Sequence, residues 1–224
     1  MKKEEIYWAN NEPLFCDDFK LPFDRFVGLA SGLKLFTQFA LFPKSSSAQV
    51  LVLDENAEQL NWFKKILSFE SLPDCIEWAQ QIKDSKQKEV SRFGKQKIIF
   101  LGKTPLNQPD TISLLGLQSE WKLFRRCSFH FMNIDLLKEP RRPLEFIREG
   151  KRCHVWFSNV FDYHWKMYEE GYPHLKQKFD EMLCELSGLE NPCYLDLYRP
   201  AGGHIHRWSD EIYNFNGGIQ TLSK

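Results

Sequence analysis

The chain has 224 residues, and 30 basic residues balance 30 acidic ones, so its formal net charge is zero. A neutral chain lacks the broad positive field that drives non-specific binding to nucleic acid, and this disfavours duplex DNA as a partner. Hydrophobic residues make up 42% and aromatic residues 15%, enough for a packed core without disulfides or a structural metal. This length and composition predict one sizeable domain with a bulky, aromatic-rich interior.

The amino-terminal segment and the cysteines indicate a cytoplasmic protein. Residues 1–8 are charged and have no apolar core of the kind found in secretory leaders. Every apolar stretch is far shorter than a membrane span, so we expect no membrane-spanning helix. The six cysteines are scattered without a C-x-x-C pair: Cys16, Cys75, Cys127, Cys153, Cys184 and Cys193. We interpret them as free thiols in a reducing compartment.

Strand and helix patterns alternate along the chain after an N-terminal arm or helix at residues 1–22. Short apolar runs predict buried strands at 26–30, 49–54, 97–101, 128–135, 154–158 and 192–198. Apolar residues at helical spacing predict helices at 33–42, 56–69, 70–95, 112–124 and 163–186. A break is expected at Pro43 and Ser45–Ser47. The alternation predicts an α/β fold, with a mostly parallel sheet covered by helices on both faces, for residues 23–224 as a single domain.

Small and polar residues follow the predicted strands, at the ends where parallel sheets bind ligands. The glycines of the turn Gly28–Gly32 permit tight backbone geometry and close approach of a ligand. Asp54 closes the next strand, 22 residues after Gly32, near the spacing expected of an acid that binds a ribose. Asp135 closes a later strand, and Ser158 and Asn159 follow another. Together these positions predict a site for a nucleoside cofactor.

In the order of these features, residues 23–200 resemble the class I S-adenosylmethionine-dependent methyltransferases, which have a Rossmann-like, doubly wound sheet. The resemblance implies that the turn holds the methionine part of the cofactor through Gly28, Ala30, Ser31 and Gly32. It implies that Asp54, with Glu55 beside it, binds the ribose hydroxyls and that Asp135 meets the adenine amino group. The expected cofactor is S-adenosylmethionine, and no metal is expected.

The segment Ser158–Phe161 resembles the [Asp/Asn/Ser]-Pro-Pro-[Tyr/Phe] pattern of amino-group methyltransferases. The resemblance implies that Ser158, at the edge of the cofactor site, and Asn159 hold the acceptor while the Phe161 ring covers it. Tyr163 is a further candidate contact to the substrate. The sulfonium is already a good leaving group, so alignment of the reactants supplies most of the catalysis. We expect methyl transfer to an amine, hydroxyl or ring nitrogen of a small molecule or macromolecule.

Two other functions remain open at this stage. The segment Ala30–Gly32, followed by Asp54, Asn56 and Gln59, resembles enzymes that transfer the aminocarboxypropyl arm of S-adenosylmethionine, such as those that make betaine lipids. Such a transferase, or a lyase, would cut the same cofactor at a different carbon. The third possibility is a catalytically inactive Rossmann-like module for binding or assembly. The sequence leaves the acceptor, the oligomeric state and the strand order of residues 70–125 open.

Several of these residues also have purely structural interpretations. Asp54 is a candidate N-cap for the helix that begins near Asn56, and Asp135 is of a type common in turns. His130 and His154 lie inside apolar strands, and we expect both in the core. The pair His204 and His206 lacks a third metal ligand at a diagnostic spacing, so we interpret it as surface or loop histidines.

Overall fold

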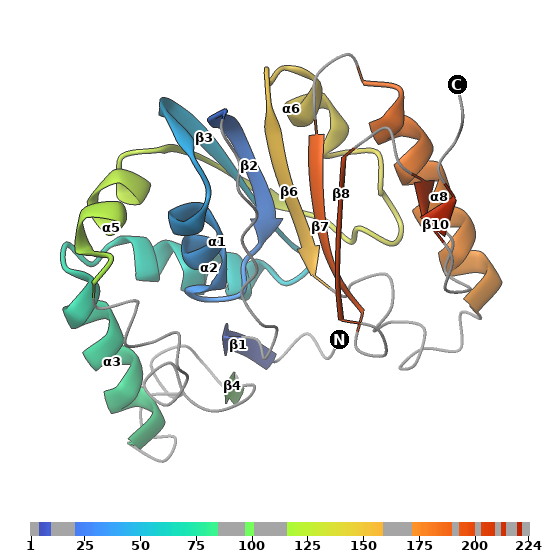
Figure 1. The fold of residues 1–224 in the computed structure, drawn as a ribbon. Helices are drawn as coiled ribbons and strands as arrows, with labels where there is room; N and C mark the ends of the chain where they lie inside the picture. Colours follow the sequence, from blue (N-terminus) through green and yellow to red (C-terminus); the bar gives the residue numbers. More distant parts are fainter. Residues whose placement is uncertain are drawn as a thin grey trace. The chain divides into compact units, whose positions relative to one another are not determined.

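The computed structural model describes residues 5–9, 21–84, 97–100, 116–158, 172–189, 193–199, 203–208, 212–213 and 219–220 (Figure 1). These residues form two compact units, each assembled from separate stretches of the chain. The first unit takes its described residues from 1–20, 30–43 and 56–128, and the second from 21–29, 44–55 and 129–224. Within the described ranges, no helix combines the length and the apolarity that crossing a bilayer requires.

The second unit is built on a six-stranded sheet in the order β5–β3–β2–β6–β7–β8 (Figure 1). The first five strands of this order are parallel, and β8 runs antiparallel to β7. The strands are β2 (Phe23–Leu29), β3 (Lys44–Asp54), β5 (Ser128–Asn133), β6 (Cys153–Ser158), β7 (Cys193–Arg199) and β8 (Gly203–Trp208). The expected α/β fold with a mostly parallel sheet is therefore confirmed.

One face of this sheet carries the core of the second unit. Val27 on β2 is in register with Leu51 on β3 and with Val155 on β6. Residues in register on neighbouring strands point to the same face. All three join Ile147 of α6 (Leu144–Arg148) and Leu183 of α8 (Tyr172–Ser187) in one buried apolar cluster. This packing explains the continuous apolar runs from which the strands were predicted.

The first unit is helical and has an aromatic core. It contains α1 (Lys34–Leu41), α2 (Ala57–Leu67), α3 (Leu72–Asp84) and α5 (Gln118–Arg125), together with the parallel pair β1 (Glu5–Ala9) and β4 (Lys97–Phe100). Phe36 of α1 meets Trp121 of α5 edge-on, with 5.0 Å between ring centroids, and Phe39 lies 4.9 Å from Phe124. These four rings are fully or almost fully buried, so they hold α1 against α5.

The structure corrects several expectations about the elements. Helix α1 ends at Leu41, in line with the break expected at Pro43, but Ser45–Ser47 lie inside β3, which begins at Lys44, five residues before the predicted strand. The described part of the helix expected at 112–124 begins only at Gln118. Strand β4 pairs with β1 in a separate small sheet. The carboxyl-terminal region, which carried no clear pattern, supplies β8 and the antiparallel pair β9 (Ile212–Tyr213) and β10 (Ile219–Gln220).

Candidate functional site

Three of the expected site positions lie at the carboxyl ends of adjacent strands in the second unit. Gly28 on β2 is in register with Val52 on β3 and with Trp156 on β6. Asp54 and Ser158 each lie two residues beyond these partners, at the last residues of β3 and β6. Since neighbouring strands are about 4.8 Å apart, the fold brings Gly28, Asp54 and Ser158 to one stretch of the sheet edge.

The strand order reverses its direction at β2. Along the chain, β3 and then β5 are added on one side of β2, whereas β6 and β7 are added on the other (Figure 1). Open α/β sheets bind ligands outside the carboxyl ends of the strands at such a reversal. The glycine-bounded segment that starts at Gly28 therefore leaves the sheet at the position that the topology favours for a ligand.

Asp54 is held by its main chain at the end of β3. Its carbonyl accepts hydrogen bonds from the Ile134 N–H at 2.8 Å and from the side-chain amide of Asn133 at 2.9 Å. The following helix, α2, is capped by Asn56, whose Oδ1 accepts from the Glu58 N–H at 3.0 Å. The interpretation of Asp54 as the N-cap is therefore wrong, because Asn56 fills that role.

Asp135 lies two residues beyond β5, and β5 is separated from β2 by β3. Its Oδ1 accepts a hydrogen bond from the Leu137 N–H at 3.0 Å, and its Oδ2 lies 3.1 Å from Nζ of Lys138. Its carbonyl accepts from the N–H groups of Lys138 and Glu139. The interpretation of Asp135 as a turn residue is confirmed, and its contact with an adenine stays a prediction. Glu55, which directly follows β3, is half-buried.

In the first unit, the segment that follows β2 begins with the fully buried Ala30. The Ala30 carbonyl accepts a hydrogen bond from Nε2 of Gln59 on α2, and the Ser31 carbonyl accepts from the Lys34 N–H at 3.2 Å. Gly32 has a φ of 59°, a conformation that favours glycine. Helix α1 then starts without a side-chain cap, so the main-chain N–H groups of its first turn, other than that of Lys34, remain potential donors to a ligand. Within the described structure, the buried Oγ of Ser31 has no hydrogen-bond partner.

The residues expected to bind the methyl acceptor fall at the edge of the described structure. Ser158 is the last residue of β6. Asn159, Phe161 and Tyr163 lie outside the described residues. The structure therefore locates the expected cofactor-binding positions, and the expected contacts to the acceptor stay predictions.

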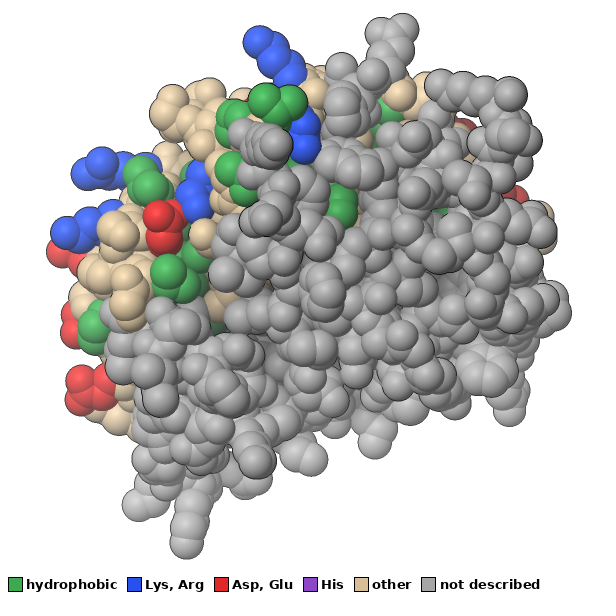
Figure 2. Space-filling view, in the orientation of Figure 1, with side chains coloured by type: hydrophobic (Ala, Val, Ile, Leu, Met, Phe, Trp, Pro, Cys, Tyr) green, Lys and Arg blue, Asp and Glu red, His purple; other side chains and the backbone are tan. Residues whose placement is uncertain are grey.

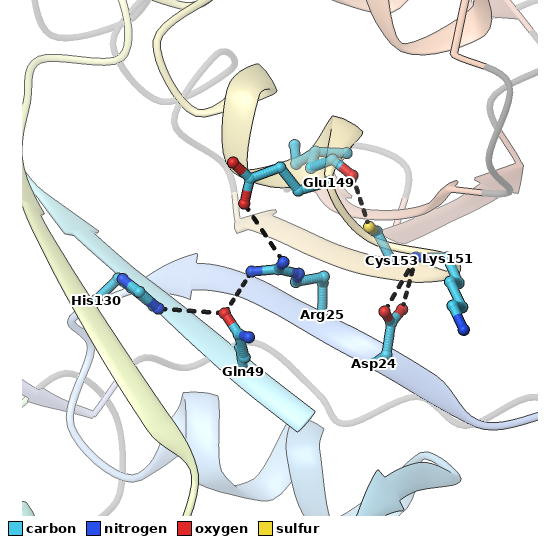
Figure 3. Close-up of polar contacts among 8 residues, drawn as sticks. Asp24, Arg25, Gln49, His130, Glu149, Lys151 and Cys153 are labelled. Carbon is cyan, nitrogen blue, oxygen red and sulfur yellow. Dashed lines mark hydrogen bonds and ion pairs between the residues drawn. The ribbon is translucent and has the colours of Figure 1, made fainter. Parts of the chain in front are cut away.

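A second polar cluster lies near the amino end of β2 (Figure 3). Arg25 donates a hydrogen bond to Oε1 of Gln49, and Nε2 of His130 lies 3.2 Å from the same oxygen. Arg25 also lies 3.4 Å from a carboxylate oxygen of Glu149 and 4.5 Å from the ring centroid of Phe146. A guanidinium only donates, so Oε1 of Gln49 accepts from Arg25, and the same oxygen can accept from Nε2 of His130 in the tautomer that has its proton there. His130 is exposed on the edge strand β5, so its expected place in the core is wrong.

The other histidines divide between the core and the edge of the sheet. His154 is fully buried, as expected, and its ring lies 5.7 Å from that of Phe23 and 5.5 Å from that of Tyr194. In the β7–β8 register, His206 stands opposite Asp196. Among the side chains that the structure describes, no three His, Cys, Asp or Glu are grouped to hold a metal ion.

Charges of both signs are mixed on the surface. Figure 2 shows Lys and Arg side chains interspersed with Asp and Glu over the described part of one face. In the second unit, Glu185 lies 3.3 Å from Nε of Arg141 and 2.9 Å from an Nη of Arg148. Arg142 lies 3.5 Å from Glu139. The basic segment around Arg141 is thus balanced by acids, in keeping with a solvated face.

Asn56 and Gln59 lie beside the candidate site, where Asn56 caps α2 and Gln59 bonds to Ala30, and the predicted site residues did not include them. Asn56 has a readable signal, because asparagine directly before a helical pattern is a favourable N-cap. In the sequence, Gln59 belongs only to the pattern shared with aminocarboxypropyl transferases, and nothing there indicates its bond to Ala30. No family model matches this chain, and neither does any curated protein or solved structure. Its function must therefore be argued from the residues and their geometry.

Proposed function

We propose that this chain has a Rossmann-like fold, binds S-adenosylmethionine at the carboxyl ends of β2 and β3, and transfers the methyl group to an amine, hydroxyl or ring nitrogen. One observation carries the proposal. The strand order reverses at β2, where a glycine-bounded segment leaves the sheet beside the terminal acid of β3. In parallel sheets, nucleoside-bearing cofactors bind where the strand order reverses, beside a turn of small residues and an acid at the end of the next strand.

Asp54 is proposed to bind the ribose. The two oxygens of a carboxylate accept hydrogen bonds from two neighbouring hydroxyls. The bonds that the Asp54 carbonyl accepts from Ile134 and Asn133 fix its main chain, so its side chain extends from a rigid strand end. Because Asn56 caps α2, the capping of that helix does not depend on the Asp54 carboxylate.

The segment Gly28–Gly32 and the start of α1 are proposed to face the amino-acid arm of the cofactor. The first turn of α1, which has no side-chain cap, supplies N–H donors, and the Ser31 hydroxyl, which has no hydrogen-bond partner among the described residues, supplies a further polar group. In methyl transfer, the lone pair of the acceptor attacks the methyl carbon while the carbon–sulfur bond breaks. The task of Ser158, Asn159, Phe161 and Tyr163 is to align the acceptor for this attack.

Thermal-shift titration tests the proposal. A ligand that binds only the folded state, present at 100 times its Kd, raises the free energy of unfolding by about 2.7 kcal/mol. We expect S-adenosylmethionine and S-adenosylhomocysteine to raise the Tm, and formation of S-adenosylhomocysteine to identify methyl transfer. Asp54→Asn should weaken binding about tenfold or more through the lost charge-assisted bonds. Glu77→Gln, on the exposed face of α3, is the matched control. No Tm shift at millimolar ligand would refute the proposal.

Aminocarboxypropyl transfer is the second candidate, and one contact favours it. Gln59, the last residue of the pattern shared with those enzymes, bonds to Ala30 in the same pattern. The two halves of that pattern, which are distant in sequence, therefore meet in the structure. Release of methylthioadenosine in place of S-adenosylhomocysteine would indicate transfer of this arm or its cleavage by a lyase. Binding without release of either product would indicate an inactive binding module.

A further inference from the structure

Gln59 is a buried side chain that reaches from one helix to the turn before another. Its residue is 1% exposed, and its Nε2 donates to the carbonyl of Ala30, which is itself fully buried. We infer that Gln59 is the positioning residue of the cofactor-binding turn. The inference rests on the proposed function and adds to it how the turn is held.

The start of α2 makes Gln59 a rigid support. Asn56 caps the helix, and the Gln59 N–H donates to the Asn56 carbonyl at 3.0 Å. The spacing Asn56-x-x-Gln59 matches that of a capping box, a motif with glutamate or glutamine three residues after the N-cap, although here the Asn56 Oδ1 accepts from the Glu58 N–H. Glutamate would serve a capping box equally well. Only glutamine also has an amide donor for the Ala30 carbonyl, so this contact explains the residue type.

The bond to Gln59 also sets the polarity of the turn. The Ala30 carbonyl receives the Gln59 amide, and the Ser31 carbonyl receives the Lys34 N–H. With these two carbonyls engaged inside the unit, the turn keeps main-chain N–H donors and the Ser31 hydroxyl, which can donate or accept. The proposed function places the amino-acid arm of the cofactor at this turn. Loss of the Gln59 bond should therefore weaken the binding of ligands that carry this arm, whereas the binding of adenosine alone does not depend on Gln59.

Gln38 offers a matched control in the same unit. It lies on α1 and is fully buried, but neither of its side-chain amide atoms has a hydrogen-bond partner within the described structure. Gln38→Met and Gln59→Met each replace a buried amide with an apolar side chain of similar length. Only the second change removes a hydrogen bond to the turn.

Calorimetric titration with S-adenosylhomocysteine and with adenosine tests the inference. Gln59→Met and Gln59→Glu should each weaken the binding of S-adenosylhomocysteine about tenfold or more, and should change the affinity for adenosine less than about twofold. Gln38→Met should leave both affinities within about twofold. Native-state hydrogen exchange at the amides of Gly32 to Lys34 should accelerate in Gln59→Met and not in Gln38→Met.

The outcomes separate the inference from the proposed function. Suppose that the wild-type chain binds both compounds, but Gln59→Met lowers the two affinities equally or lowers neither. Gln59 then does not position the turn, and the proposed function stands. Unchanged hydrogen exchange at the turn in Gln59→Met also overturns the inference, with or without ligand. If the wild-type chain binds neither compound, the proposed function fails and the ligand-positioning role fails with it.

Discussion

Asp24 ties β2 to the segment that leads into β6, and its removal should destabilise the second unit (Figure 3). Its Oδ1 accepts from the Arg152 N–H at 2.7 Å, and both of its oxygens accept from the Lys151 N–H, at 3.1 and 3.0 Å. Two main-chain donors therefore depend on one carboxylate. In Asp24→Ala, neither donor has this partner, and the start of the β2–β6 pairing loses a constraint.

The expected magnitude follows from these bonds. Hydrogen bonds to a charged group contribute about 1.5–3 kcal/mol each, so two donors set an upper limit of about 6 kcal/mol. Lys151 is exposed, so water replaces its bond at small cost, and we expect a loss of about 2–3 kcal/mol. Asp24→Asn keeps one acceptor oxygen for Arg152 and should lose about half as much.

Urea denaturation followed by circular dichroism measures these differences as changes in midpoint at constant m-value. Glu149→Ala is the matched control, because that carboxylate is 61% exposed and lies 3.4 Å from Arg25. An exposed pair of this kind contributes about 0–1 kcal/mol. If Asp24→Ala and Glu149→Ala differ by less than about 0.5 kcal/mol, the reasoning from main-chain donors is refuted.

Three further predictions concern packing and the buried thiols. Gly150→Ala would place a Cβ 2.4 Å from Cγ of Arg25 and 2.6 Å from Sγ of Cys153. Urea denaturation should therefore show a free energy of unfolding lower by about 1–3 kcal/mol. Gly188→Ala meets nothing closer than 3.5 Å and should be close to neutral; equal losses would contradict the prediction. Trp121→Phe removes the bond from the indole N–H to the Phe69 carbonyl at 3.1 Å and should cost about 1–3 kcal/mol, and an unchanged urea midpoint would exclude that contribution. Burial raises the pKa of Cys75 and of Cys153 from an ordinary 9.0 to about 12. The unfolded thiols therefore ionise first, and the free energy of unfolding should fall above about pH 9, by up to about 1.4 kcal/mol per pH unit for each thiol. Urea midpoints between about pH 8 and pH 10 measure this fall, and Cys153→Ala should fall less steeply; an identical slope would show that this thiol does not contribute.

Most of the elements around the candidate site, and their order along the chain, could be predicted from the amino-acid sequence. Apolar runs placed β2, β3 and β6, and helical spacing placed α1 and α2 close to their observed bounds. These signals are local, because the periodicity of a strand or helix is written in consecutive residues. The positions of Gly28, Asp54 and Ser158 at strand ends followed from the same local reading.

Which of these strand ends are neighbours, and which partner each polar group has there, follows from the tertiary fold. The order of strands, the pairing of β4 with β1 and the exposure of His130 on an edge strand depend on contacts between segments distant in sequence. Asp54 and Asn56 are both acceptable helix caps by residue type, and the backbone path selected Asn56. In the sequence, Gln59 is one residue of the pattern shared with aminocarboxypropyl transferases, and its bond to Ala30, 29 residues away, exists only because the two segments pack together. Local propensity specifies a helix or strand, whereas the hydrogen-bond partner of a buried polar group depends on which segments pack against it in the folded chain.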